Sequence, residues 1–242
     1  MNDPVLVACS HGTRSAAGRE VVEELRAAVR RARPGLEVHA AHVDVQEPEL
    51  GAVLAALTAA GRTSVVVPLL LSSGYHVRVD IADALRDNGP HAVAAPALGP
   101  GDAVTDVVVD RLEQALGSPL ADFDGAVVLA AAGSSDARAA ADVDAAVASL
   151  GRRLGRPVTS GFLSAQTPTV PEAVAAARAA GASRVAVAGY LLAPGVFSAR
   201  LAAAGADVVA APMGPHPGLV RLVLDRFDTA VAQLAPQTVP AS

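Results

Sequence analysis

The chain has 242 residues and a formal net charge of −5, and 52% of its residues are hydrophobic although only 2% are aromatic. A chain of this length forms one large domain or two small ones, with cores built here from Ala, Val and Leu. The net negative charge argues against nucleic acid or an anionic membrane surface as a partner.

Apolar runs and Ala-rich amphipathic stretches alternate along the chain. In the first half we predict strands over 5–9, 36–43, 64–71 and 92–96, and helices over 15–33, 48–60, 77–87 and 102–116. The matching strands of the second half are predicted over 126–131, 157–163, 184–192 and 207–211. Continuous apolar strands are typical of parallel sheets that are covered on both faces. The β-α-β-α order with short connections therefore predicts an α/β fold with right-handed crossovers.

The two halves repeat one another, because 4–116 matches 125–234 at an offset of 120–121 positions. This predicts two tandem domains, 1–118 and 124–235, joined by a linker within 117–125, and a disordered tail over 236–242. The clearest matches pair Ser10-His11-Gly12-Thr13 with Ala131-Ala132-Gly133-Ser134, Val43-Asp44-Val45-Gln46-Glu47-Pro48 with Leu163-Ser164-Ala165-Gln166-Thr167-Pro168, and Leu71-Ser72-Ser73-Gly74-Tyr75-His76 with Leu192-Ala193-Pro194-Gly195-Val196-Phe197.

Three side chains of the first copy differ from the second in a way that points to chemistry. His11, Asp44 and His76 are matched by Ala132, Ser164 and Phe197. Each of the three follows or ends a predicted parallel strand, so all should meet at the carboxyl edge of one sheet, where open α/β sheets bind ligands. Two imidazoles and a carboxylate suit a divalent transition metal with open coordination positions, and a neutral imidazole is also a base near ambient pH.

The neighbouring segments are suited to bind anions. Gly12-Thr13-Arg14 and Ser72-Ser73-Gly74 each lead into a predicted helix, and free N–H groups at a helix N-terminus bind carboxylates or phosphates. Arg14 and Arg78 are predicted to bind acidic groups of the ligand, and Tyr75 is a candidate for stacking on it.

Cysteine content and apolar run lengths predict the compartment. Cys9 is the one cysteine, which excludes an internal disulfide and fits a reducing compartment. The N-terminal residues show neither a basic segment nor an apolar run of signal-peptide length, and no apolar stretch approaches the ~20 residues of a membrane helix. We expect a soluble cytoplasmic protein that is a monomer or a homodimer.

The segments around the three side chains resemble a known family. Ser10-His11-Gly12-Thr13-Arg14, Asp44, and the run from Pro68 through Ser72-Ser73-Gly74-Tyr75-His76 to Asp80 resemble the sirohydrochlorin chelatases, which insert Co²⁺ or Fe²⁺ into sirohydrochlorin. The resemblance spans both halves and matches the long, two-domain form. It implies two tandem flavodoxin-like domains with the site in the first.

The resemblance also implies roles for individual residues. His11 and His76 would bind the metal and accept the pyrrole protons, in the service of cobalamin or sirohaem biosynthesis. The family's acidic residue is usually Glu, whereas Asp44 is shorter, so Glu47 is an alternative acidic ligand. Ser10, Gly12, Thr13, Arg14, Ser72, Ser73, Gly74, Tyr75 and Arg78 would contact the acidic tetrapyrrole. No permanently bound cofactor is implied, and the sequence holds no Gly-x-x-x-x-Gly-Lys loop for ATP.

Other interpretations of these residues stay open. Asp44 could cap the helix that starts nearby, and His42, two positions before it on the same strand face, is expected to pack or to support the site. His39, His91 and His216 have no role in the repeat comparison. As a whole, the chain could be a metal or tetrapyrrole carrier without turnover, a histidine-type phosphatase, or an interaction domain. The phosphatase is disfavoured because Ser10 stands where that chemistry needs an Arg before the histidine.

Overall fold

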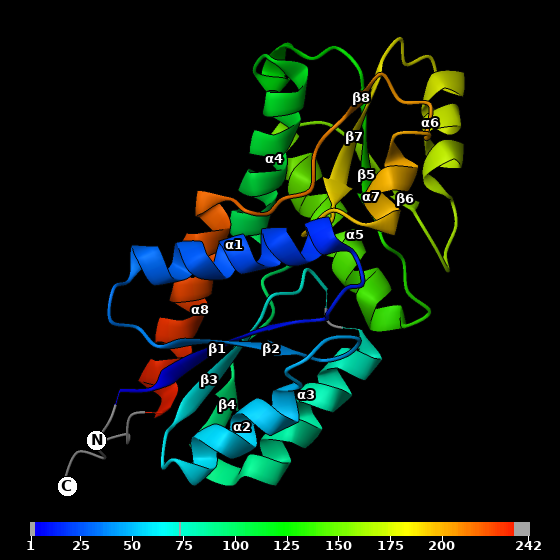
Figure 1. Cartoon of the computed structure of the whole chain (residues 1–242). Helices are drawn as coiled ribbons and strands as arrows, with labels where there is room; N and C mark the ends of the chain where they lie inside the picture. Colours follow the sequence, from blue (N-terminus) through cyan, green and yellow to red (C-terminus); the bar gives the residue numbers. More distant parts are fainter. Residues whose placement is uncertain (1–2, 73, 235–242) are drawn as a thin grey trace, which may run out of the picture.

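Two four-stranded parallel sheets, one from each half of the chain, lie one above the other with helices on both faces of each (Figure 1). The computed structural model describes residues 3–72 and 74–234, with the main chain alone for 75–78. The predicted tail 236–242 and Ser73 lie outside the described residues. The α/β class with two flavodoxin-like parallel sheets is confirmed.

The elements alternate as predicted. The strands are β1 Val5–Ser10, β2 Val38–His42, β3 Ser64–Pro68, β4 Ala92–Ala94, β5 Ala126–Ala131, β6 Val158–Phe162, β7 Val185–Tyr190 and β8 Val208–Val209. The α-helices are α1 Ala16–Ala32, α2 Leu50–Ala59, α3 Tyr75–Asn88, α4 Asp102–Leu116, α5 Ala137–Leu154, α6 Val170–Ala179, α7 Val196–Leu201 and α8 Pro217–Leu234. Short 3₁₀ turns occupy Gly89–His91 and Leu120–Asp122, the latter within the predicted linker.

Local signals explain where the longer helices begin. Ser15 is the N-cap of α1, and its hydroxyl accepts the Gly18 N–H. In the second copy Asp136 caps α5, and Thr169 forms a capping box with Glu172 at the start of α6. Such caps satisfy N–H groups that have no partner within the helix. Six predicted strands are two or three residues longer than the observed ones, because their apolar patterns continue beyond the paired residues, as at Leu69, Leu70 and Leu71 after β3.

Strand order and register bring the three candidate positions to one edge. Each sheet has its first strand flanked by the second and third, in the orders β2-β1-β3-β4 and β6-β5-β7-β8. Ser10 at the end of β1 is level with His42 of β2, and Cys9 is level with Pro68 of β3. The residues that follow each of these strands therefore leave the sheet side by side.

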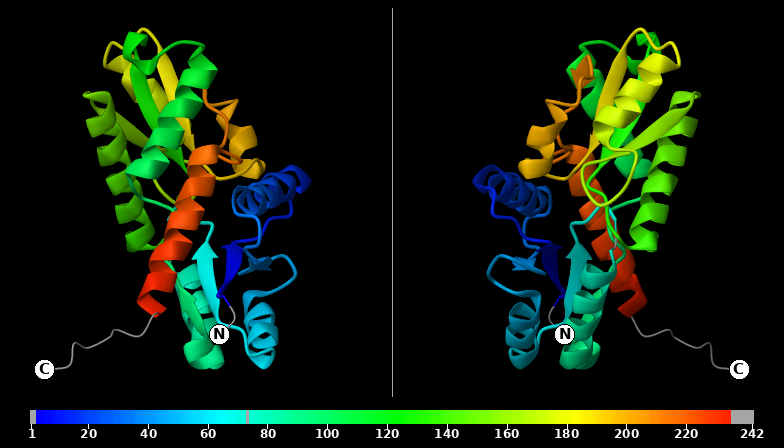
Figure 2. Two further views of the ribbon diagram at one scale, coloured as in Figure 1. Left: turned by 90° about the vertical axis from the view of Figure 1, so that its left-hand side faces the viewer. Right: turned by 90° about the vertical axis from the view of Figure 1, so that its right-hand side faces the viewer.

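The last helix of each half packs against the sheet of the other half. Helix α4, which ends the first repeat, packs against β7, β8 and α5 of the second half. Helix α8, which ends the second repeat, packs against α1 and β3 of the first half, and Figure 2 shows it descending beside the lower sheet. The segments 1–118 and 124–235 each contribute a whole sheet, but the layers that cover the two sheets are shared between them.

Because α4 and α8 pack across the two halves, the largest hydrophobic core extends through both. The largest apolar cluster runs from Leu6 and Val65 in the first sheet, through α1, α4, α5 and α8, to Leu129 and Ala188 in the second. Two smaller clusters fill the outer faces, one under α2 and α3 and one under α6 and α7. Among the described helices none is long and apolar enough to cross a membrane.

Candidate functional site

A cavity of about 940 Å³ lies between the two halves, at the carboxyl ends of both sheets. This is at the upper end of the ~300–1,000 Å³ that small-molecule sites occupy. The first half contributes the loop after β1 and the segment after β3, and the second half contributes the matching loops after β5 and β7. Of the lining side chains that the structure describes, Asp136 alone carries a formal charge at neutral pH, so the walls are mainly apolar.

His11 is placed where the sequence predicts it. It directly follows β1, is exposed, and lines the cavity. Within the described part of the chain no group hydrogen-bonds to its imidazole, whereas His39, His42 and His216 each have a hydrogen-bond partner. An exposed imidazole in a cavity, with no structural bond to a described residue, is available to a ligand.

Asp44 is tied to His11 through the main chain. The Asp44 N–H donates to the His11 carbonyl at 2.9 Å. The Gly12 φ of 98° favours glycine, and a Cβ at that position would collide with the Asp44 carbonyl. The approach of these two loops therefore depends on glycine.

The two candidate acids differ in their contacts. The Asp44 carboxylate is exposed and accepts the Val45 N–H at 2.7 Å through Oδ1, while Glu47 accepts the Glu49 N–H at 3.2 Å. Neither lines the cavity. Each carboxylate has a second oxygen beyond the bond described, so both remain candidate ligands.

The His76 side chain lies outside the described residues, as do those of Tyr75 and Arg78. The main chain places His76 second in α3, the helix that follows the cavity-lining segment Leu69–Ser72. Among the described side chains, those of 3–72, 74 and 79–234, no group of three or more His, Cys, Asp or Glu is arranged to hold a metal. Because His76 is not among these side chains, this absence does not bear on the predicted triad.

Gln46 supports the His11 loop and was not foreseen from the sequence. Its Oε1 accepts the Thr13 N–H at 2.7 Å, and in the second copy Gln166 accepts the Ser134 N–H in the same way at 3.0 Å. A comparison that looks for differences between copies passes over such a residue. The signal was the shared Gln-x-Pro in two otherwise different loops.

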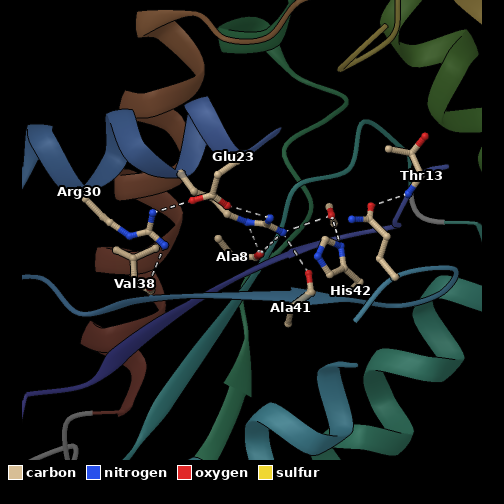
Figure 3. A network of polar contacts seen from close by, with 10 residues as sticks. Ala8, Thr13, Glu23, Arg30, Val38, Ala41 and His42 are labelled. Atoms are coloured by element: carbon tan, nitrogen blue, oxygen red, sulfur yellow. Dashed lines mark hydrogen bonds and ion pairs between the residues drawn. The ribbon is translucent and has the colours of Figure 1, made fainter. Parts of the chain in front are cut away.

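A buried polar network lies beneath the loop (Figure 3). The Arg26 guanidinium donates to the carbonyls of Ala8 and Ala41 at 3.1 and 3.2 Å, and to Ser10 Oγ at 3.3 Å. Ser10 Oγ lies 2.9 Å from His42 Nδ1. Ser10 Oγ accepts from Arg26 and also forms a hydrogen bond with His42 Nδ1, so it links the guanidinium to the imidazole. Arg26 thus joins the ends of β1 and β2.

Burial is the main cause of the pKa shifts of the residues in and next to this network. Desolvation, and secondarily the Arg26 charge, lower the pKa of His42, so its imidazole is neutral near pH 7. Desolvation also lowers the pKa of Arg26, opposed by Glu23 at 3.4 Å. Burial raises the pKa of the Cys9 thiol to about 12, which makes it an unreactive core residue.

The expected anion-binding loop is largely capped by the protein itself. The N–H groups of Thr13, Ser15 and Gly18 are bonded to Gln46, to the Thr13 hydroxyl and to the Ser15 hydroxyl. Thr13, Ser72 and Gly74 line the cavity, and so does Ser10 at its floor. Arg14 is exposed and is not among the lining residues.

The opposite wall comes from the second copy. Its lining includes Ala132 and Phe197, the counterparts of His11 and His76. Ser164, which matches Asp44, bonds through its hydroxyl to the Ala132 carbonyl at 2.8 Å. The counterpart positions in the second copy thus serve the fold and an apolar wall.

Comparison with known proteins bears on both copies. The family model described as CbiX matches residues 5–115 and again 126–230. A sirohydrochlorin cobaltochelatase of Methanosarcina barkeri is 29% identical over 125 residues, which are 46% of this chain and 95% of the relative. Its counterpart in Methanosarcina acetivorans is 27% identical over the same length.

Two solved structures share the whole fold. SirB from Bacillus subtilis with Fe³⁺ superposes with a TM-score of 0.81 at 20% identity, covering 98% of each chain. CbiX, described as the terminal enzyme of siroheme biosynthesis in denitrifying bacteria, superposes with a TM-score of 0.67 at 22% identity, covering 94% of this chain and 99% of that one. Because the family model matches both repeats, the chain belongs to the CbiX family of sirohydrochlorin chelatases.

Proposed function

We propose that this protein inserts a divalent metal, Co²⁺ or Fe²⁺, into sirohydrochlorin without ATP. The observation that carries the proposal is the position of His11: exposed, at the carboxyl end of β1, and lining a cavity of about 940 Å³. The mainly apolar walls suit the faces of a flat macrocycle. The relatives named as sirohydrochlorin cobaltochelatases support the same substrate.

The chemistry needs a metal ligand and a proton acceptor at one place. Two pyrrole N–H protons must leave the macrocycle for each M²⁺ that enters, and both end in solvent. We assign their acceptance to His11 and His76, because imidazole is the side chain whose ordinary pKa suits proton acceptance near neutral pH. The same two residues, with Asp44, would hold the incoming metal as a substrate, and Glu47 is the alternative acid. His42 is buried beneath the loop and supports it rather than meeting the macrocycle.

Substrate contacts follow the lining of the cavity. Gly12, Thr13, Ser72 and Gly74 are proposed to contact the macrocycle, with the second-copy loops as its other wall. Arg14 and Arg78 are assigned to carboxylates that extend beyond the cavity, and Tyr75 and Ser73 are likewise proposed to contact the macrocycle. Ser10 acts from the floor through its bonds to Arg26 and His42.

The metal determines the pathway. The same nitrogen and oxygen ligands accept cobalt for cobalamin and iron for sirohaem, and affinity rises from Fe²⁺ through Co²⁺ to Ni²⁺. Among the structural relatives, SirB has been solved with both Fe³⁺ and cobalt. We therefore assign the reaction and leave the choice between cobalt and iron to measurement.

The test is anaerobic insertion into sirohydrochlorin with Co²⁺, Fe²⁺ and Ni²⁺ side by side, followed by the loss of free sirohydrochlorin absorbance. We expect many turnovers per protein molecule with Co²⁺ or Fe²⁺. A loss that stops at one equivalent would identify a carrier instead. Release of phosphate from generic esters would support the phosphatase alternative.

A further inference from the structure

A side-chain hydrogen bond joins the second half of the chain to the cavity-lining segment of the first. Tyr190 is the last residue of β7, and its hydroxyl donates to the Leu71 carbonyl at 3.1 Å. The Tyr190 side chain is 5% exposed and itself lines the cavity. Burial raises the pKa of Tyr190 well above its usual range, so the phenol keeps its proton and remains a donor.

The two residues before Leu71 are held by hydrogen bonds within the first half. The Leu69 N–H donates to the Cys9 carbonyl at 2.7 Å, which ties the segment to the end of β1. The Leu70 carbonyl accepts from the N–H groups of Leu98 and Gly99 at 2.9 and 3.2 Å. Leu71 is then held by Tyr190, and the chain continues through Ser72 into α3. Through the Tyr190 bond, the second half of the protein holds the main chain of this segment.

The internal repeat supplies a comparison. The second-copy counterpart of Leu71 is Leu192, whose carbonyl accepts the Gly214 N–H of its own half at 2.8 Å. In the first copy the corresponding glycine, Gly99, donates to Leu70 instead, and the Leu71 carbonyl is left to Tyr190. The counterpart of Tyr190 in the first copy is Leu69, which has no hydroxyl. The bond therefore exists in one direction only, from the copy without the histidines to the copy with them.

We propose that Tyr190 is a positioning residue for metal insertion: it fixes the main chain of the segment that leads to α3, and so the start of the helix that carries His76. This inference rests on the proposed function. Gly99 belongs to the same device, because a side chain there would collide with both the Tyr190 hydroxyl and the Leu71 carbonyl. The second half thus contributes more than an inert wall.

The test uses the full-length chain with Tyr190→Phe, which removes the hydroxyl and keeps the ring. Gly99→Ala is a second variant aimed at the same bond. The matched control is Thr105→Val, which removes a buried hydroxyl that bonds to Ser149 at 2.9 Å between α4 and α5, outside the cavity lining. Thermal unfolding establishes that all three variants fold. Hydrogen exchange over 69–72, Co²⁺ affinity, and kcat and KM for anaerobic insertion are then measured.

We expect Tyr190→Phe to raise exchange over 69–72 but not over the matching 190–193, and to lower kcat/KM roughly 5- to 50-fold with weaker Co²⁺ binding. Gly99→Ala should do the same, and Thr105→Val should change neither. Wild-type exchange and insertion in Tyr190→Phe, or a loss equal to that of Thr105→Val, would overturn the proposal. If the wild-type chain inserts no metal, the proposed function fails, while the exchange comparison still decides whether Tyr190 anchors the segment.

Discussion

The main-chain N–H of Asp44 donates to the carbonyl of His11 at 2.9 Å, so two candidate metal ligands from neighbouring strands are fixed to one another by their backbones. In the second copy the matching pair is joined differently, through the hydroxyl of Ser164 and the carbonyl of Ala132. A carboxylate has no proton to donate, so Asp44 cannot make the bond that Ser164 makes. The Asp44 side chain is thereby left to other partners.

Replacing Asp44 with serine, the residue at the matching position of the second copy, tests whether Asp44 is a metal ligand. We expect Asp44→Ser to fold normally, because serine already occupies the equivalent loop of the second copy. Its kcat/KM for metal insertion should fall about 5- to 30-fold, from the loss of one ligand worth ~1–2 kcal/mol. Activity equal to wild type would remove Asp44 from the site and direct attention to Glu47, for which Glu47→Gln is the companion variant.

The Arg26 network should be a large contributor to stability. Arg26 is 3% exposed and serves the Ala8 and Ala41 carbonyls and the Ser10 hydroxyl. Arg26→Met keeps the apolar stem and leaves these acceptors unsatisfied, which should lower the free energy of unfolding by about 2–4 kcal/mol. Denaturant titration measures this directly. The control is Arg31→Met, which should cost under ~1 kcal/mol because the Arg31 side chain is 64% exposed in its ion pair with Glu24. Equal effects of the two variants would contradict the network's importance.

Acid should destabilise the start of α8 through His216. Its Nδ1 accepts the Gly218 N–H at 3.0 Å, and desolvation, then the Arg111 charge, lower its pKa despite the opposing effect of Asp110. The unfolded chain takes up this proton near pH 6.5, whereas the folded chain resists it until lower pH. The contribution of His216 is therefore complete above pH 6.5 and is lost as the pH falls towards the lowered folded pKa.

The measurement is the free energy of unfolding between pH 7.5 and 5 for wild type and His216→Asn. Asparagine retains an N-cap acceptor but does not titrate. The decline with acid should be shallower in the variant, although His42, whose pKa is lowered in the same direction, remains in both proteins. Identical slopes would show that His216 does not contribute.

A histidine added to the second copy should not create a second site. Ala132→His restores one ligand at the counterpart of His11, but Ser164 and Phe197 still stand where the other two ligands would be. We expect Co²⁺ binding by the double variant His11→Ala/Ala132→His to match that of His11→Ala alone in equilibrium titration. Recovery of binding or turnover would mean that a single imidazole on either wall suffices.

Much of the fold and part of the site could be predicted from the sequence. The alternation of apolar strands and amphipathic helices was sufficient to predict two parallel sheets. The mismatch of His11 with Ala132 was sufficient to identify His11 as a candidate site residue, and it lines the cavity. The role of Gln46 could not be predicted from differences between the copies, because both copies have glutamine at this position. The burial of Arg26 could not be predicted either, because an arginine in an amphipathic helix usually faces solvent. Arg26 nevertheless lies beside the apolar stripe of Val22, Leu25 and Val29.

The contacts between distant parts of the chain could not be predicted from the sequence. The periodicity of α4 and α8 shows that each buries an apolar face but not against which sheet, so their exchange between halves could not be foreseen. Tyr190 sits in an apolar strand and gives no sign that its hydroxyl crosses to Leu71. The side-chain arrangement around His76 lies outside the described residues, and its role stays a prediction.

The most direct test of the central claim is anaerobic Co²⁺ insertion by His11→Ala and, separately, by His76→Ala. Sirohydrochlorin absorbance gives the rate, and circular dichroism and thermal unfolding verify the fold. We predict that each variant folds like the wild type and loses at least about 100-fold in kcat/KM, as removal of a ligand that also accepts protons requires. Full activity in a folded His11→Ala protein would contradict the assignment of this cavity as the site of metal insertion.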